Sequence, residues 1–318
     1  ATNDIVMIYH ADMYACPGLD VEINKHIKPG VVVSATRIEP PLHPPGPEKI
    51  LADYGIEPEE FDEQQLLRDL DKFKDKDKTT EGIFAPWAIY KDDFTSIGGH
   101  DPLYAPQSKE DSDIFNRFLL NGYKFIQTWE GFVYHMTCRG SRFADGAKRN
   151  PNGEVFMKNR ETDEWLQQNH RSTRNFIRKW GHFVKHDNHL KPIVPPKYDI
   201  GFVIRNCSYD RLYELEPWCS TIYTDWAGKG YIELEQENTI IDMNERVKSL
   251  VTEKVENDIV VEFDARDFTT KHMEYIAQLS EIFSNDEELE VGEFELDIFK
   301  IKINKIKTYE EELIKCER

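Results

Sequence analysis

Three groups of imidazole and carboxylate side chains stand out because each lies at the end of a predicted helix or strand. His10 and Asp12 follow an apolar run, residues 110–113 (EDSD) open a helical pattern, and His135 ends a strand-like segment. Carboxylates and imidazoles together suit a divalent cation such as Mn²⁺. Carboxylates in the first turn of a helix are favoured by its dipole and are well placed to act as a base. These residues indicate a metal site beside a candidate base.

Each group also has a structural interpretation. Asp12 would cap a turn, and Asp111 or Asp113 would be a helix N-cap, which is the commoner role of an acid at that position. A single histidine such as His135 is more often structural than a metal ligand. The order of the three groups along the chain is what favours a functional site.

Hydrophobic periodicity predicts the elements that must position these side chains. Residues 4–9 are an apolar run typical of a buried strand, residues 110–122 have helical spacing, and residues 124–135 are typical of a strand. In open α/β sheets, ligands bind beyond the carboxyl ends of the strands. We therefore expect the histidines and carboxylates to meet at one edge of a sheet.

The chain is predicted to be α/β, with a mixed-sheet catalytic domain followed by a small α+β domain. Residues 1–150 carry all three groups, and residues 151–197 are a helical segment that ends in a proline-rich linker. Residues 198–318 alternate short strands and helices, with a strand predicted at residues 231–236.

Composition excludes several classes of protein. The chain has 59 acidic and 40 basic residues, a formal net charge of −19, so duplex nucleic acid is not expected as the main partner. The acidic excess lies mostly in residues 198–318, where 29 acidic residues face 14 basic ones. We see no apolar stretch long enough for a membrane span. Five cysteines without a CxxC pair fit a reducing compartment, and we expect a cytoplasmic protein.

The order of the groups resembles the catalytic half of a GT-A glycosyltransferase of the family-2 type. The matching segments are YHADMY at residues 9–14, FTSIGGHDP at 94–102, KEDSDIFNRFLLNGY at 109–123 and VYHMTCRGSRF at 133–143. The glycine pair followed by the ED-x-D pattern is the most specific part. The sequence also resembles, more weakly, the divergent glycosyltransferases of large DNA viruses and phages.

The resemblance implies transfer of a sugar from a nucleotide-diphosphate donor to a hydroxyl of a glycan or other acceptor, with inversion. It implies that Asp111 is the general base and that Asp12 and His135 hold Mn²⁺ or Mg²⁺. Donor and acceptor binding is expected from His10, Trp87, Gly98, Gly99, Asp101, Glu110, Asp113, Arg139 and Arg142. Trp87 would stack on a sugar, and the two arginines would bind phosphate oxygens.

Two departures from the family pattern leave alternatives open. His10 stands where the family has an aspartate, and the segments that bind the nucleotide base in the family do not precede this motif here. We expect further residues or a partner chain to supply that donor-binding half. The main alternative is a non-catalytic GT-A-like module that binds glycan or scaffolds a partner. A metal-dependent hydrolase is a third interpretation, because the same carboxylates could activate water.

Overall fold

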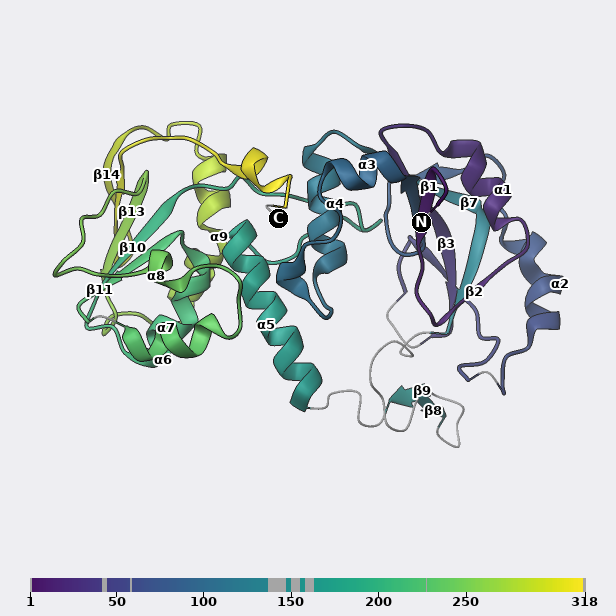
Figure 1. Cartoon of the computed structure of the whole chain (residues 1–318), viewed down its shortest axis with the longest axis horizontal. Coiled ribbons are helices and arrows are strands. Elements are labelled where there is room, and N and C mark those ends of the chain that lie inside the picture. Colours follow the sequence, from purple (N-terminus) through teal and green to yellow (C-terminus); the bar gives the residue numbers. More distant parts are fainter. Residues whose placement is uncertain are drawn as a thin grey trace.

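The computed structural model of the chain describes residues 2–41, 45–57, 59–136, 147–149, 155–157, 163–226 and 228–316. These residues form two mixed sheets with separate hydrophobic cores, together with the short hairpin of β8 (Ala147–Arg149) and β9 (Val155–Met157). Figure 1 shows the two sheets at opposite ends of the long axis, with α4 (Glu110–Leu120) and α5 (Asp163–Trp180) between them. The mixed α/β class is therefore confirmed. Among the helices described, none is long and apolar enough to cross a membrane.

The first sheet has the strand order β1-β6-β3-β7-β2, with β4 beside β3 and β5 beside β7. The central strands β3 and β7 are parallel to each other, whereas β6 and β2 are antiparallel to their neighbours. The strands are β1 (Ile5–Ile8), β2 (Met13–Ala15), β3 (Val31–Glu39), β4 (Lys49–Leu51), β5 (Thr79–Thr80), β6 (Trp87–Tyr90) and β7 (Lys124–His135).

Helices cover this sheet because their apolar residues recur on one face. In α4, Ile114 and Phe118 lie one turn apart, are fully buried, and belong to the same core as Trp87 of β6. The other helical elements of this half are α1 (Leu19–His26), α2 (Glu63–Phe73), α3 (Lys91–Ser96) and the 3₁₀ segment η1 (Pro102–Tyr104).

The first strand differs from the prediction in one respect that matters for the site. β1 is only half-buried, because it is an edge strand that pairs with β6 alone, and it is not the buried strand that its apolar run predicts. Its successor β2 lies at the opposite edge, where Met13 pairs with His135. Residues 9–12 therefore cross the sheet at the carboxyl ends of β3 and β7.

The second sheet has the order β12-β11-β10-β13-β15-β14, and its first four strands are parallel. Parallel neighbours need crossover connections, and helices follow β10, β11 and β13 along the chain. This half is therefore α/β, and the prediction of an α+β domain is wrong. The strands are β10 (Ile200–Arg205), β11 (Thr221–Thr224), β12 (Val247–Ser249), β13 (Ile259–Asp264), β14 (Gly292–Leu296) and β15 (Phe299–Ile303).

The predicted strand at residues 231–236 is instead part of helix α7 (Lys229–Gln236). Tyr231 and Glu235, one helical turn apart, are its buried residues. The other helical elements of this half are α6 (Tyr209–Leu215), α8 (Met243–Arg246), α9 (Thr270–Asn285) and the 3₁₀ segments η2 (Glu216–Trp218) and η3 (Glu310–Leu313).

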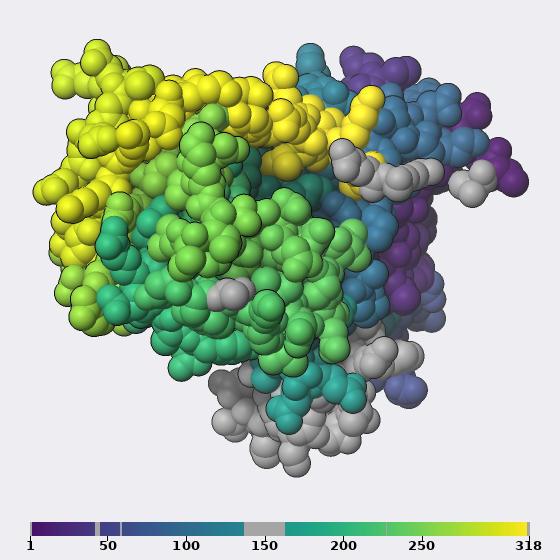
Figure 2. All heavy atoms as spheres, turned by 60° about the vertical axis from the view of Figure 1, so that its left-hand side comes forward, coloured from purple at the N-terminus to yellow at the C-terminus, as the bar shows by residue number. Residues whose placement is uncertain are grey.

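Helix α5 packs against both halves of the chain. Phe176 and Trp180 form a small core with Leu103 and Tyr104 of the first half. Arg178 forms an ion pair with Glu216 of the second half, in which Nη2 lies 2.7 Å from Oε2. The C-terminal segment, yellow in Figure 2, runs over the second half and reaches the first. The two halves are thus joined by buried contacts as well as by the proline-rich linker.

Candidate metal centre

His10, Asp12 and His135 converge where residues 9–12 cross the sheet. Each offers one ligand atom, and these atoms all lie within 4.8 Å of one another. His135 Nε2 is 3.5 Å from Asp12 Oδ1, and the rings of His10 and His135 have centroids 6.1 Å apart. Asp12 and His135 are buried, whereas His10 is partly exposed. The group has the donor types and the spacing of a cation site with one side open to solvent.

Glu39, the last residue of β3, orients His135. Its Oε1 lies 2.8 Å from Nδ1 of His135 and accepts the hydrogen bond of that nitrogen, so Nε2 is the ring nitrogen that faces Asp12. Metal-binding histidines are usually held in this way by a carboxylate on the other ring nitrogen. Burial alone would lower the pKa of His135, but hydrogen bonds to Asp12 and Glu39 outweigh it and raise the pKa above 6.5.

Two basic side chains keep Glu39 ionised. Arg37 Nη1 is 2.8 Å from Oε1, and Lys49 Nζ is 3.1 Å from Oε2. Burial raises the pKa of Glu39, yet the hydrogen bond from His135 and the charge of Arg37 more than offset it, and the pKa falls to about 2. The guanidinium carbon of Arg37 also lies 3.9 Å from the ring centroid of Phe84. Glu39 therefore presents a fixed negative charge to His135 at neutral pH.

Asp111 lies beside the cluster at the start of α4. Its Oδ2 is 3.7 Å from Nε2 of His10. The residues before the helix, Ser108 and Lys109, both have left-handed backbone conformations, with φ of 81° and 75°. Such conformations are strained in residues other than glycine and persist only where the surroundings fix them. Here Asn169 of α5 does so, because its Oδ1 accepts hydrogen bonds from both side chains.

A cavity of about 180 Å³ adjoins Asp111. Its lining combines apolar and polar groups: Ile83, Phe84, Phe115, Val184, Leu190 and Pro192 with Asp111, Ser112, Asn116, Lys185 and His186. Phe84 connects the cavity to the cluster, because its ring is 5.9 Å from that of His10. Asn116 is buried, and its Nδ2 has no hydrogen-bond partner in the described part of the chain. The cavity thus offers an apolar surface with a few polar groups for a small ligand.

Glu110 is the second predicted residue at this helix start. Burial raises the pKa of its carboxyl group above 4.5, and the charge of Asp111 adds to the effect, while His10 acts against it. Its Oε2 is buried and accepts no hydrogen bond from the described residues. Glu110 is therefore close to the site, although it does not line the cavity.

Asp101 and Asp113 are not part of the cluster. Asp113 is fully buried and contacts Arg117, Lys179 and Trp180 at 2.7, 2.7 and 2.9 Å. Asp101 caps η1 and lies 2.8 Å from Lys179. Both carboxylates lie near Cys316, but Lys179 already occupies the space between them. Their role in the structure is to hold α4 against α5.

Gly98, Gly99 and Trp87 also have structural positions. The two glycines have φ of 88° and 69° in the turn after α3, and a Cβ there would meet Cys316 and Phe94 at 3.2 and 3.1 Å. Trp87 is fully buried in the first core and has no face that a sugar could reach. The expectation that Trp87 stacks on a sugar is therefore wrong, because the ring packs against Phe115 and Phe118.

Two predicted residues, Arg139 and Arg142, lie outside the described residues. Three residues of the site were missed by sequence reasoning: Glu39, Phe84 and Asn116. Each belongs to a segment whose sequence is typical of a hydrophobic core, so only its neighbours in the folded chain indicate a role in the site. Glu39, for example, is the last of nine residues of β3 that are all buried.

No family model matches the chain, and no curated protein is similar to it at a significant level.

Proposed function

We propose that the chain is a metal-dependent glycosyltransferase that moves a sugar from a nucleotide-diphosphate donor to a hydroxyl group of an acceptor. The observation that carries the proposal is the position of the cluster beside Asp111. His10 belongs to the cluster, and its Nε2 is 3.7 Å from Asp111 Oδ2. A base next to a cation suits a reaction in which a hydroxyl loses its proton while a diphosphate departs.

The cluster fits a divalent cation held by His10, Asp12 and His135. Two imidazoles and one carboxylate favour Mn²⁺ over Mg²⁺, since Mg²⁺ prefers oxygen ligands. When bound, the cation would neutralise the charge that develops on the departing diphosphate. Glu39 supports the ligand role of His135, because its hydrogen bond to Nδ1 holds the ring with Nε2 toward Asp12, where a bound cation would replace the proton on Nε2.

Asp111 is the candidate base, and the adjoining cavity is the candidate acceptor site. The Asp111 side chain is 24% exposed, so it can reach a bound hydroxyl while α4 holds its backbone. Ser112 and Asn116 offer hydrogen bonds in the same cavity, and Phe84 offers an apolar face of the kind on which sugar rings pack. We expect the acceptor hydroxyl to lie against Asp111.

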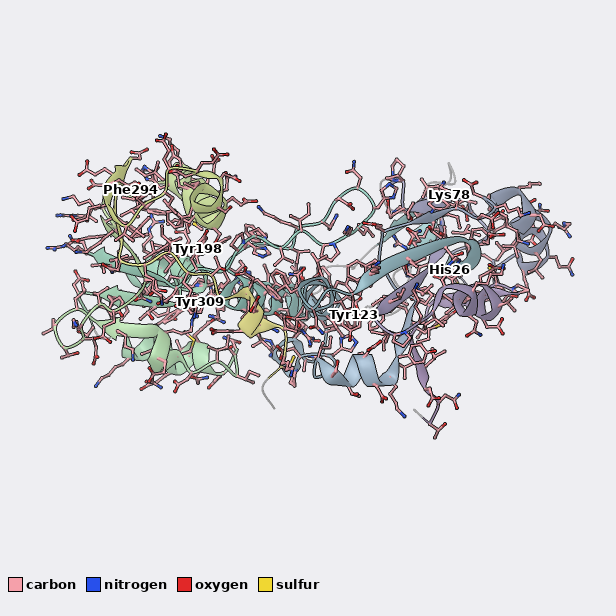
Figure 3. All side chains as sticks on the ribbon, turned by 90° about the horizontal axis from the view of Figure 1, so that it is seen from above. His26, Lys78, Tyr123, Tyr198, Phe294 and Tyr309 are labelled. Carbon is pink, nitrogen blue, oxygen red and sulfur yellow. The ribbon has the colours of Figure 1, made fainter. Side chains whose placement is uncertain are left out.

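Donor binding is the first test of this proposal. UDP-, GDP-, CDP- and dTDP-sugars are added with and without Mn²⁺, and the melting temperature is measured. We expect one nucleotide to raise it only with Mn²⁺, because a ligand of the folded state stabilises that state. The Asp12→Ala variant loses this rise, whereas His26→Ala, a control in α1 (Figure 3), keeps it. A rise that Asp12→Ala retains would contradict the assignment of the metal site.

Turnover tests the base. Asp111→Asn should lower the rate by about 10²–10⁴-fold while Mn²⁺ binding is unchanged, because only proton transfer is lost. Asp92→Asn is the matched control, since Asp92 is exposed in the first turn of α3. Full activity in Asp111→Asn would refute the assigned role. Glycan binding without turnover in the unaltered chain would instead support the non-catalytic module.

The donor set also favours a second candidate, a metal-dependent hydrolase. Two histidines and one carboxylate with an open side are the ligands of several catalytic zinc sites, where the metal carries a water molecule. The two candidates differ in their second substrate. A hydrolase cleaves its substrate at a rate that no added acceptor changes, whereas a transferase forms a new glycoside in proportion to the acceptor. Product analysis with and without acceptor separates them.

A further inference from the structure

A second cavity lies where the two halves of the chain meet. Its volume is about 550 Å³, and it shares no lining residue with the cavity at Asp111. Its walls come from η1, α5, the end of the linker, α8 and the C-terminal segment, which Figure 1 shows ending between the two halves. In Figure 3, Tyr198 and Tyr309 mark this region, and the backbone nitrogen of Tyr309 donates to the carbonyl of Lys197 at 2.7 Å.

Basic side chains dominate the charged lining of this cavity. Five are basic and two are acidic: Arg178, Lys179, Lys197, Arg246 and Lys315 face Asp101 and Glu312. The apolar lining consists of Leu103, Ile240, Ile241 and Leu313. In a chain with a net charge of −19, a basic cavity needs a specific explanation.

The buried ion pairs on one side of the cavity leave one positive charge without a partner. Three guanidinium groups, of Arg174, Arg178 and Arg246, share the two carboxylates of Glu216 and Glu235. The contacts to Glu216 measure 3.5, 2.7 and 2.5 Å. Three positive charges against two negative ones leave an excess of one at the wall formed by Arg178 and Arg246.

The neighbouring network around Lys179 is neutral. Lys179 and Arg117 supply two positive charges, and Asp101 and Asp113 supply two negative ones. All four side chains are at most 11% exposed. This network therefore neither attracts nor repels an anion through net charge.

Lys197 adds a second uncompensated charge. Its Nζ donates to the carbonyl of Arg178 at 3.2 Å, and no carboxylate of the described residues forms an ion pair with it. Three acidic groups nearby have other partners. Asp199, whose charge acts on Lys197, accepts hydrogen bonds from Asn257 and from the backbone nitrogen of Asp258. Glu310 accepts from the backbone nitrogen of Lys197, and Glu312 pairs with Lys307. Burial, with the charge of Arg246, lowers the pKa of Lys197 to about 8. The ammonium group thus lies in a site that lacks its counter-ion.

We propose that this cavity binds the phosphate group of a small phosphorylated molecule, with Lys197 Nζ as its direct charge contact. A phosphate monoester carries close to two negative charges at neutral pH, and Lys197, Lys315 and the excess charge of the arginine group place positive charge around it. The volume lies in the range of small-molecule sites, so there is room for more than a free phosphate. The non-phosphate part packs on Ile240, Ile241 and Leu313. The proposal is independent of the metal centre and of its function.

The test measures binding of inorganic phosphate and of AMP by calorimetry and by melting temperature at constant ionic strength. We expect both to bind, with AMP at least tenfold tighter because its nucleoside contacts the apolar wall. Lys197→Met weakens both at least tenfold, whereas Lys271→Met, a control on the exposed surface of α9, does not. Without phosphate, Lys197→Met melts no lower than the original chain, because it removes a buried charge that forms no ion pair with a carboxylate of the described residues.

Three results would overturn the proposal. The first is that neither probe raises the melting temperature of the original chain at millimolar concentration. The second is that Lys197→Met retains the full rise. The third is that Lys197→Met destabilises the protein in the absence of phosphate, which would give the ammonium group a structural role through the Arg178 carbonyl. If AMP bound no more tightly than inorganic phosphate, the proposed contact of Ile240, Ile241 and Leu313 with the non-phosphate part of the ligand would be refuted.

Discussion

Replacing Glu39 by glutamine should weaken metal binding although Glu39 is not a proposed ligand. The carboxylate accepts a hydrogen bond from Nδ1 of His135 at 2.8 Å, and so fixes which ring nitrogen faces Asp12. Glutamine keeps the shape but lacks the negative charge, and its amide can present a donor to His135 instead. We expect Mn²⁺ affinity to fall about 10- to 100-fold, which is about 1.4–2.7 kcal/mol.

The same substitution should also lower stability. The fall in the pKa of Glu39 from 4.5 to about 2 corresponds to about 3 kcal/mol of stability at neutral pH. The sign follows from the depressed pKa: this contribution is present above pH 4.5 and is lost as the pH falls toward 2. In Glu39→Gln it is lost at every pH, because Arg37 and Lys49 keep their charges without this partner.

Calorimetric titration with Mn²⁺ and urea unfolding measure the two effects separately. Glu48→Gln is the matched control, because Glu48 also pairs with Arg37 and Lys49, at 3.5 and 3.8 Å, whereas Nδ1 of His135 bonds to Glu39. It should lose stability while keeping its Mn²⁺ affinity. If Glu39→Gln bound Mn²⁺ as tightly as the original chain, or if both variants lost affinity equally, the orienting role of Glu39 would be refuted.

Three further predictions concern metal choice, buried charge and acid stability. Titration should show Mn²⁺ binding at least tenfold tighter than Mg²⁺, because two of the three ligands are imidazoles; equal affinities would contradict this donor set. Asp113→Ala should cost about 3–5 kcal/mol in urea unfolding, since it leaves the buried cations Lys179 and Arg117 with Asp101 as their one remaining carboxylate, whereas Asp111→Ala should cost less than about 1. Burial raises the pKa of Glu216, but Arg246 and Arg178 lower it to about 2, so its stabilisation is complete above pH 4.5. About 3 kcal/mol should be lost as the pH falls toward 2, and Glu216→Gln should abolish this loss in unfolding curves between pH 2 and 6.

The convergence of His10, Asp12 and His135 could be predicted from the sequence because these residues lie at the ends of clearly patterned elements. The apolar run before His10 and the strand-like segment that ends at His135 locate both histidines at strand ends. Strand ends on one side of a sheet meet in space, so the two positions could be placed together without knowing the strand order. The helix that begins at Glu110 was predicted for the same reason.

The orienting and lining residues could not be predicted because their signals depend on tertiary contacts. Glu39 ends a strand whose nine residues are all buried, so no alternation distinguishes its site-facing side. Asn116 lies on the buried face of α4, where the side chain of a polar residue usually forms hydrogen bonds with neighbouring groups of the core. Its unpaired Nδ2 becomes apparent only when the neighbouring cavity is known.

The error in the second half has a local cause. Within the sequence YIELEQ, residues 232–235 alternate apolar and polar side chains, which is typical of a strand. The same residues, arranged as a helix, place Tyr231 and Glu235 on one face. Tertiary contacts decide between the strand and the helix. Glu235 binds Arg174 at 3.0 Å, and the Tyr231 hydroxyl donates to Glu216 at 2.9 Å. A segment this short fits both the two-residue period of a strand and the 3.6-residue period of a helix. The buried contacts with Arg174 and Glu216 favour the helix.

The crossing of residues 9–12 from one sheet edge to the other has a consequence for local unfolding. The edge strand β1 is four residues long and half-buried, so it is expected to open more readily than the central strands. Each opening would carry His10 away from His135, and a bound cation would have to lose a ligand first. Cation binding should therefore slow amide hydrogen exchange in β1 and β6 as well as around the ligands. Exchange rates at the edge of the sheet would then report the occupancy of the metal site.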